Sequence, residues 1–320
     1  MSAIQQKHEQ QVIDIRSWLT LIQDLCTAGG PKPNQYETVH DLFNQVNVHR
    51  KTGKLSHNDL NQLRHAFGPA MSVETMQGRS YLKKYGYAGD FEIIDEIYLK
   101  TVNPNLRFKA WDEFYQTQGA AKAVRNRKTY FKNTVHDLLM MHAALGAEPS
   151  HSSPIKILNV ASGPCRDVAE FFEEHPHAQV HFTCVEADAN AIAYAQNICA
   201  HWLDRITFLH ENAFKLQLDE QFELVWSAGL FDYFDDRAFA LLLNKLIKFT
   251  KPTDGQIIVG NFSDANPSIA YQEIGGEWML NHRSSHKLKT IALKCGYALG
   301  NIDVESEEEG INLFLRIRRS

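Results

Sequence analysis

The feature that most constrains the fold is an alternation of short, β-prone apolar runs with helical patterns after residue 155. Residues 155–161 are extended and apolar, and 164–174 follow with a helical pattern; the same order recurs at 180–185 and 189–202. Such alternation predicts a mostly parallel sheet covered by helices. Further strands are expected at 205–209, 222–226 and 256–260, and further helices at 235–249 and 284–295.

The last two extended runs, 297–304 and 311–317, are separated only by the acidic turn SEEEG. A parallel crossover needs a dozen or more residues, so two strands joined by so short a turn must pair antiparallel. The sequence therefore predicts a parallel sheet that ends in an antiparallel hairpin.

The first half of the chain is different. Apolar residues recur at helical spacing from Val12 to Ile22, and more helices are expected at 41–48 and 58–67. The stretch 145–154, LGAEPSHSSP, is small, polar and proline-bearing, which is typical of a linker. We therefore predict a helical N-terminal domain over 1–145, forming an acceptor pocket or lid, and a Rossmann-like domain over 150–320.

Composition narrows the class of protein. The 320 residues carry a net charge of −5, which does not suggest the basic surface of a nucleic-acid-binding protein. No apolar run approaches the roughly 20 residues that span a bilayer, and the polar start Met1–Gln11 lacks the apolar stretch of a signal peptide. The five cysteines are scattered singly, so we expect a cytoplasmic protein with neither a disulfide framework nor a metal site.

The segment NVASGPCRD, residues 159–167, carries the first chemical signal. It leaves a buried strand, turns on glycine and enters a helix, which directs backbone N–H groups at a ligand. A dinucleotide site prefers G-x-G-x-x-G, but Cys165 occupies the position of the second glycine. S-adenosylmethionine has no pyrophosphate and does not require that close approach. We predict contacts to this cofactor from Ala161, Ser162, Gly163 and Asp167.

The next strand ends in a second signal. Glu186 lies 23 residues beyond Gly163, near the spacing at which Rossmann units place a carboxylate on the ribose hydroxyls. We assign Glu186 to the ribose and Ala187 to the same wall. Asp188 is placed to cap the following helix instead.

The ends of the third and fourth predicted strands also carry residue types that suit binding of the cofactor's adenosine. Asn212 is positioned to bond the adenine amino group, with Ala213 beside the ring. Ser227, Gly229 and Leu230 suit a backbone that lines the adenosine and methyl-transfer cavity.

These four strand ends, taken in order, resemble a class I S-adenosylmethionine-dependent methyltransferase over about residues 155–320. The resemblance implies a Rossmann-like α/β fold with a seven-stranded sheet whose last strand is antiparallel, and S-adenosyl-L-methionine as the cofactor. The chain departs from the family in having a single glycine in the turn, which puts the turn's geometry in question more than the cofactor.

Several segments resemble one bacterial methyltransferase family more closely. They are YGYAGDFE at 85–92, AVRNRK at 123–128, GNF at 260–262, and EW and HR at 277–278 and 282–283. The namesake of that family makes 3-hydroxypalmitic acid methyl ester. The resemblance covers about residue 81 to the C-terminus and implies a carboxylate acceptor, but membership does not fix the acceptor.

The same segments supply candidate acceptor residues. Gly86 and Gly89 suggest a tight loop near a ligand. Arg125 is a candidate partner for a carboxylate, either of the cofactor's methionine end or of an acceptor. The predicted substrate-binding residues are Tyr85, Tyr87, Asp90, Arg127, Tyr233 and Arg283.

No catalytic dyad is evident. Tyr233, His282 and Asp232 are candidates for the catalytic role by position only. A carboxylate acceptor is anionic near neutral pH and needs no general base, whereas an amine or hydroxyl more often does. We therefore expect an enzyme that methylates a small organic acid. Methylation of a natural-product amine, a phenol or a protein, and a non-catalytic cofactor-binding or scaffold protein, remain alternatives. A homodimer through the N-terminal helices is a further expectation.

Overall fold

The computed structural model describes residues 15–144 and 153–319. It divides into two compact units. The first contains the described part of Met1–Leu82 with two short later segments, 102–114 and 270–277. The second contains the rest, so 83–101 and 115–144 belong with the sheet and the units do not follow the boundary predicted near residue 150. The polar start, Val12 and most of the predicted linker lie outside the described residues.

The first unit is helical. Phe43 stacks on Phe67 with ring centroids 6.0 Å apart, and Tyr271 meets Phe43 edge-on at 5.0 Å. Ser56 begins one helix with a capping box, in which its hydroxyl accepts from the Asp59 N–H while the Asp59 carboxylate accepts from the Ser56 N–H. The helices are α1 (Ile15–Thr27), α2 (Tyr36–Lys51), α3 (His57–Ala66), α4 (Met76–Leu82), and most of α6 (Lys109–Thr117) and α11 (Ile269–Ile274).

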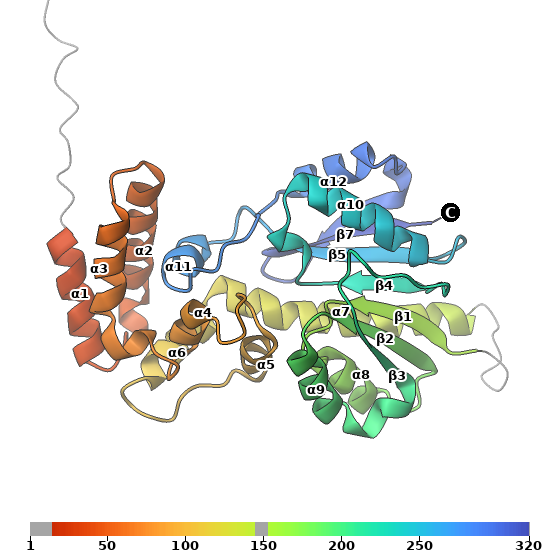
Figure 1. The fold of residues 1–320 in the computed structure, drawn as a ribbon, viewed down its shortest axis with the longest axis horizontal. Helices are drawn as coiled ribbons and strands as arrows, with labels where there is room; N and C mark the ends of the chain where they lie inside the picture. The colour runs from red at the N-terminus through yellow and green to blue at the C-terminus, as the bar shows by residue number, and fades with distance from the viewer. Residues whose placement is uncertain (1–14, 145–152, 320) are drawn as a thin grey trace, which may run out of the picture. The chain divides into compact units, whose positions relative to one another are not determined.

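The second unit is built on a seven-stranded sheet in the order β3-β2-β1-β4-β5-β7-β6 (Figure 1). β1 pairs in parallel with β2 and β4, and β7 pairs antiparallel with both β5 and β6. The predicted Rossmann-like sheet with an antiparallel closing hairpin is therefore confirmed. The strands are β1 (Ile155–Val160), β2 (Val180–Glu186), β3 (Ile206–His210), β4 (Leu224–Ser227), β5 (Gln256–Phe262), β6 (Ile302–Ser306) and β7 (Asn312–Arg318).

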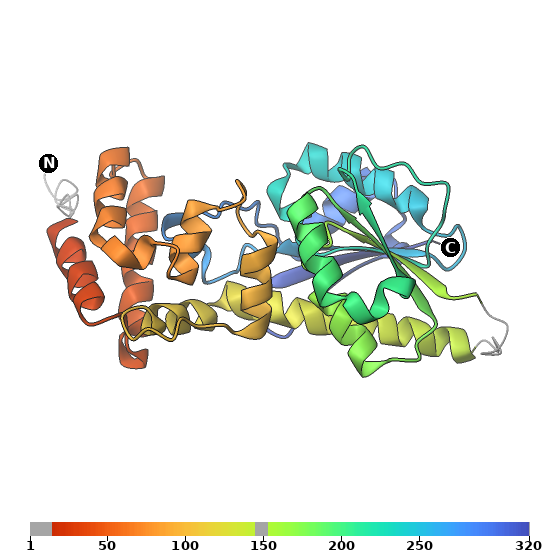
Figure 2. The same cartoon turned by 60° about the horizontal axis from the view of Figure 1, so that its bottom comes forward.

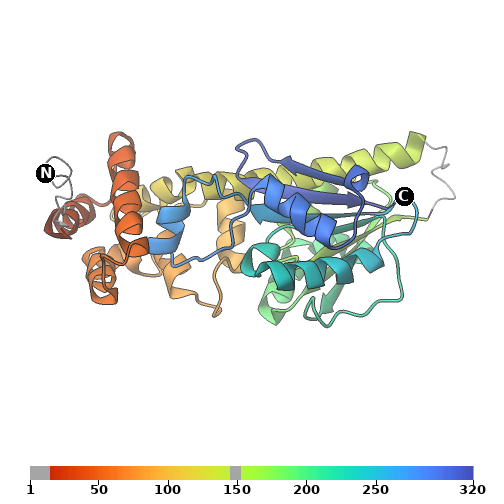
Figure 3. The same cartoon turned by 90° about the horizontal axis from the view of Figure 1, so that it is seen from above.

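Helices cover both faces of this sheet (Figures 2 and 3). One buried cluster joins Phe131 and Val168 to Phe182 of the sheet, and the other joins Leu242 and Leu288 to the opposite face. Burial of these two apolar layers is the main stabilising term of such a fold. α7 (Gly119–Ala144), α8 (Arg166–Glu174) and α9 (Ala189–Ile198) cover the first face, and α10 (Asp236–Leu246) and α12 (Ser285–Lys294) cover the second.

Several helix boundaries differ from expectation. α2 is longer than the expected 41–48, and the helix expected over 235–249 ends at Leu246 and continues as a 3-10 turn, Ile247–Phe249. α8 begins at Arg166 instead of Pro164, because Cys165 has a left-handed φ of 52° that an α-helix does not contain. The helix expected over 189–202 is α9 followed by a 3-10 turn, Ala200–Arg205. Within the two described ranges, no helix has the length and apolar character needed to cross a membrane.

Candidate functional site

The turn between β1 and α8 has an unusual backbone. Ala161, Gly163 and Cys165 have φ values of 56°, 55° and 52°, so three alternate residues occupy the left-handed region. Only glycine reaches that region without steric cost, yet two of the three positions carry side chains. The turn thus has three left-handed residues although its sequence has one glycine.

Glu186 joins this turn to the next strand. Its Oε2 accepts from the Gly163 N–H at 2.9 Å, and its Oε1 accepts from the N–H groups of Ala187 and Asp188 at 2.7 and 3.1 Å. Asp188 caps α9 by accepting from the Asn190 N–H at 2.9 Å, as predicted. Both residues lie at the carboxyl end of β2, on the edge where open α/β folds bind ligands.

A cavity of about 540 Å³ opens at these strand ends. Every residue that lines it belongs to the second unit. Its size suits a cofactor-sized ligand. Among the predicted site residues it brings together Tyr85, Tyr87, Arg127, Ala161, Ser162, Gly163, Asp167, Glu186, Ala187, Gly229, Leu230, Asp232 and Tyr233.

The predicted residues outside this cavity have other contacts. Arg125 donates to the Oε1 and the carbonyl oxygen of Gln116, both at 2.8 Å, and Asp90 caps α5 (Phe91–Leu99) by accepting from the Ile93 N–H. Asn212 accepts from the Phe214 N–H, and Ala213 packs against the sheet core. The predicted site residues that are absent from the described lining of the cavity are Arg125, Asp90, Asn212, Ala213, Ser227, His282 and Arg283.

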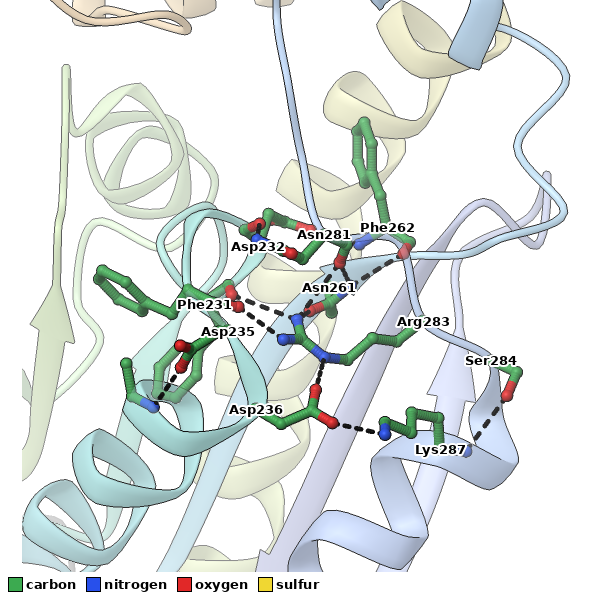
Figure 4. Close-up of polar contacts among 12 residues, drawn as sticks. Phe231, Asp232, Asp235, Asp236, Asn261, Phe262, Asn281, Arg283, Ser284 and Lys287 are labelled. Carbon is green, nitrogen blue, oxygen red and sulfur yellow. Dashed lines mark hydrogen bonds and ion pairs between the residues drawn. The ribbon is translucent and has the colours of Figure 1, made fainter. Parts of the chain in front are cut away.

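Arg283 is a buried structural hub (Figure 4). Its guanidinium donates to Asn261 Oδ1 at 2.7 Å and to the Phe234 carbonyl at 2.5 Å, and it forms an ion pair with Asp236 at 3.1 Å. These bonds hold the segment after β4 against the end of β5. Arg283 is therefore a structural residue and does not line the cavity.

Arg127 is the cationic residue of the cavity. Only 9% of it is exposed, and among residues 15–144 and 153–319 its one hydrogen bond runs from Nε to the Tyr98 hydroxyl at 3.5 Å. Burial by itself lowers its pKa, but Tyr98, Asp232 and Asp167 raise it above the ordinary value, so the guanidinium stays charged. A buried guanidinium has five donors, and most of these are available to an anionic group of a ligand.

Two carboxyl groups of the cavity are perturbed. Burial raises the pKa of Asp167 and of Asp232 to about 6 each, against the opposing effects of backbone hydrogen bonds and of Arg127. Asp232 Oδ1 accepts from the Phe262 N–H at 2.5 Å. Perturbed carboxyls in a cleft are typical of functional sites.

The cavity tyrosines retain their protons. Burial is the largest cause that raises the pKa of Tyr87, Tyr98 and Tyr233 above the ordinary value. Tyr87 donates to Asp188 Oδ2 at 2.9 Å, and Tyr233 donates to the Ala88 carbonyl at 2.7 Å. These hydroxyl groups are therefore poor general bases at neutral pH.

Sequence reasoning missed part of the cavity. Asn159 lines it from within β1, and its Nδ2 is buried without a partner in the described structure; the same holds for Ser162 Oγ. Such orphaned groups fit a polar ligand, because buried polar atoms normally have a partner. A polar residue inside an apolar strand was the available signal for Asn159. Trp278, which was not among the predicted site residues, also lines the cavity.

These features define the class of protein. Residues 157–253 match the family model of a methyltransferase domain. This methyltransferase domain, together with the seven-stranded sheet, supports the S-adenosylmethionine-dependent methyltransferase that the sequence predicted.

One solved structure supports the fold, and a second has a weaker similarity. A possible exported protein from Bordetella parapertussis has a TM-score of 0.57 at 14% identity, covering 96% of this chain and 95% of that one. Magnesium protoporphyrin IX methyltransferase from Synechocystis PCC 6803 has a TM-score of 0.45 at 15% identity, covering 66% and 92% of the two chains. The latter similarity is too low to bear on the acceptor. No curated protein matches the sequence.

Proposed function

We propose that this enzyme transfers the methyl group of S-adenosylmethionine to the carboxylate of a small organic acid. The observation that carries the proposal is Arg127, a buried cation that lines the cavity with most of its N–H donors unused by the residues that the structure describes. Arginine binds carboxylates in a bidentate manner, which fixes both position and orientation. 3-Hydroxy fatty acids, implied by the resemblance of the sequence, belong to this acceptor class.

The cofactor would be held on the other side of the cavity. Glu186 is placed to accept hydrogen bonds from ribose hydroxyls, and the turn at Gly163 presents backbone N–H groups. Asn159 and Ser162 offer the orphaned polar atoms. When bound, S-adenosylmethionine supplies a methyl group activated by the positive sulfur. The residues of the chain orient the acceptor and exclude water around it.

The ionisation states support an acceptor that is already anionic. The tyrosines of the cavity hold their protons, so none of them supplies a phenolate base. A carboxylate with an ordinary pKa needs no deprotonation at neutral pH. Orientation by Arg127 is then the main contribution required of the protein.

A second candidate is methylation of an amine or hydroxyl acceptor. It is favoured by Asp232, whose pKa of about 6 lies near the working pH expected of an efficient general base. Of the Asp232 oxygens, Oδ1 is bonded to the Phe262 N–H, and the residue lines the cavity. Asp232→Asn should abolish transfer to such an acceptor but spare transfer to a carboxylate.

The deciding experiment measures methyl transfer to 3-hydroxy acids and to matched amines, with wild type, Arg127→Gln, Asp232→Asn and Arg125→Gln. Arg125 lies two residues from Arg127 but outside the cavity, so Arg125→Gln is the matched control. We expect Arg127→Gln to raise the KM of the acid at least tenfold and to change cofactor affinity little. If Arg127→Gln instead weakens S-adenosylmethionine binding alone, the arginine binds the cofactor's own carboxylate and the proposed acceptor loses its support.

We also propose that the enzyme is cytoplasmic, because its five cysteines are free thiols. Cell fractionation tests this. The homodimer through the N-terminal helices and the acceptor-pocket role of those helices stay predictions. Light scattering of the purified chain measures the first, and activity of a chain lacking residues 1–82 measures the second.

A further inference from the structure

Gly89 lies in unusually close contact with two aromatic side chains. A first side-chain carbon at this position would lie 2.3 Å from Trp278 Cζ2 and 2.8 Å from Tyr233 Oη. Real side chains do not approach so closely, and φ at Gly89 is +68°. Glycine is therefore required here, because the two aromatic residues pack directly on the main chain.

A chain of hydrogen bonds fixes both aromatic side chains. Trp278 Nε1–H donates to Tyr233 Oη at 3.0 Å, and the Tyr233 hydroxyl donates to the Ala88 carbonyl at 2.7 Å. Each aromatic residue is thus held at its polar end. Tyr233, Trp278 and Gly89 all line the cavity, and we call these three residues the aromatic wall.

The aromatic wall lies next to the proposed reaction centre. Tyr233 directly follows Asp232 in the chain, and the pKa of Tyr233 is raised by burial and by that carboxyl. The Arg127 guanidinium is 3.1 Å from where a side-chain carbon on Gly229 would lie, at the end of the strand that leads to Tyr233. The aromatic wall and the Arg127–Asp232 pair therefore line the same cavity.

We infer that the aromatic wall makes the enzyme select acceptors that carry a flat ring over flexible chains of the same size. The inference rests on the proposed methyl transfer but not on which atom accepts the methyl group. A rigid aromatic surface stacks with a planar ring, and aromatic pairs gain beyond simple area burial. A flexible chain loses more conformational freedom when it is confined against the same surface. A cavity of about 540 Å³ that also holds the cofactor favours a compact acceptor as well.

The test uses two pairs of compounds that differ only in having a ring or a chain. 3-Phenylpropionate and nonanoate have equal numbers of carbon and oxygen atoms, and 3-phenylpropylamine and nonylamine are matched in the same way with nitrogen. For each compound, kcat/KM with S-adenosylmethionine and the dissociation constant in the presence of S-adenosylhomocysteine are measured on the full-length protein.

We expect the ring member of a pair to be preferred about tenfold or more in binding and, where it is methylated, in kcat/KM. Trp278→Leu should bring that ratio close to one while S-adenosylmethionine affinity changes less than about twofold. Trp202→Leu is the matched control, because Trp202 stacks on Phe172 outside the cavity and the ratio should remain.

The outcomes separate this inference from the proposed function. If ring amines are preferred and methylated while neither acid is methylated, the carboxylate proposal fails and the wall's role stands. If nonanoate matches or exceeds 3-phenylpropionate in binding, the inference is overturned and chain acids such as 3-hydroxy fatty acids regain support. An unchanged ratio in a folded Trp278→Leu variant overturns it as well.

Discussion

The carboxylate of Glu186 accepts a 2.9 Å hydrogen bond from the backbone N–H of Gly163, which ties the tip of β2 to the turn after β1. The two residues are 23 positions apart in sequence but lie at adjacent strand ends, because β1 and β2 pair in parallel. The bond fixes the carboxylate beside the turn that is expected to receive the cofactor.

Glu186→Ala should therefore weaken S-adenosylmethionine binding by about tenfold to a hundredfold, since hydrogen bonds to charged groups are worth about 1.5–3 kcal/mol. Isothermal titration with S-adenosylmethionine and S-adenosylhomocysteine measures the loss. Glu211→Gln serves as the control, because Glu211 follows the neighbouring strand β3 but does not line the cavity. Equal affinity in wild type and Glu186→Ala would remove Glu186 from the cofactor site.

The left-handed turn leads to a prediction about stability. Gly163→Ala should destabilise the fold by about 1–2 kcal/mol, because a side chain at φ +55° is strained even though nothing lies near it. Ala161→Gly should stay within about 1 kcal/mol of wild type, since relief of the strain at Ala161 is offset by the greater freedom of glycine in the unfolded chain. Urea denaturation of the two variants compares them. If Ala161→Gly lowered the free energy of unfolding by more than about 1 kcal/mol, the packing of the alanine methyl group would outweigh its backbone strain.

The buried carboxyl of Asp232 should make stability depend on pH. Its pKa is about 6 in the folded protein and about 3.9 in an unfolded chain. Between these values the folded state holds a proton that the unfolded state has lost, so this group's contribution to the free energy of unfolding falls as pH rises from about 4 to about 6.

Asp232→Asn has no carboxyl to titrate, so this pH-dependent loss of stability is absent from the variant. The free energy of unfolding of the variant relative to wild type should therefore rise from about pH 4 to about pH 6 and stay constant above that. Asp236→Asn is a control of opposite sign, because Lys287 and Arg283 hold the pKa of Asp236 below its ordinary value. Urea unfolding at several pH values gives both differences. A pH-independent difference for Asp232→Asn would mean that this carboxyl titrates normally.

The buried hydrogen bonds of Arg283 predict that its replacement strongly lowers the stability of the fold without directly changing ligand binding. Arg283→Met should destabilise the protein by about 2–4 kcal/mol, because the Phe234 carbonyl and Asn261 Oδ1 lose a buried donor. Lys287→Met is the matched control: its ion pair with Asp236 is exposed and worth less than about 1 kcal/mol. Thermal unfolding distinguishes the two. The folded Arg283→Met protein should retain S-adenosylmethionine affinity, and a selective loss of affinity would place Arg283 at the ligand after all.

Local patterns gave reliable strand and helix positions in the second unit. The runs at 155–161 and 180–185 became β1 and β2, and the short turn near 306–310 forced the antiparallel hairpin of β6 and β7. The strand-end residues Gly163 and Glu186 also meet as expected, because parallel pairing brings their strand ends to one edge. These features depend on residues that are close in sequence, or on the rule that strands joined by a short turn pair antiparallel and strands joined by a helix pair in parallel.

The direction in which a side chain points was harder to predict from the sequence. We expected Arg125 to be the partner of a carboxylate, but Arg127, two residues further along α7, is the arginine that lines the cavity. A helix turns by about 100° per residue, so residues two apart point to very different sides. Only the placement of α7 against the sheet decides that Arg127 reaches the cavity while Arg125 bonds Gln116.

The sequence by itself determined the class of fold and placed Gly163 and Glu186 at the carboxyl edge of the sheet, where we propose that the cofactor binds, because strand periodicity, turn length and strand-end chemistry are local properties. The tertiary structure decided which residues line the side of the cavity that we propose for the acceptor. Gly89, Tyr233 and Trp278 are far apart in the chain, and their contact arises from packing and from one shared hydroxyl, which no local pattern encodes.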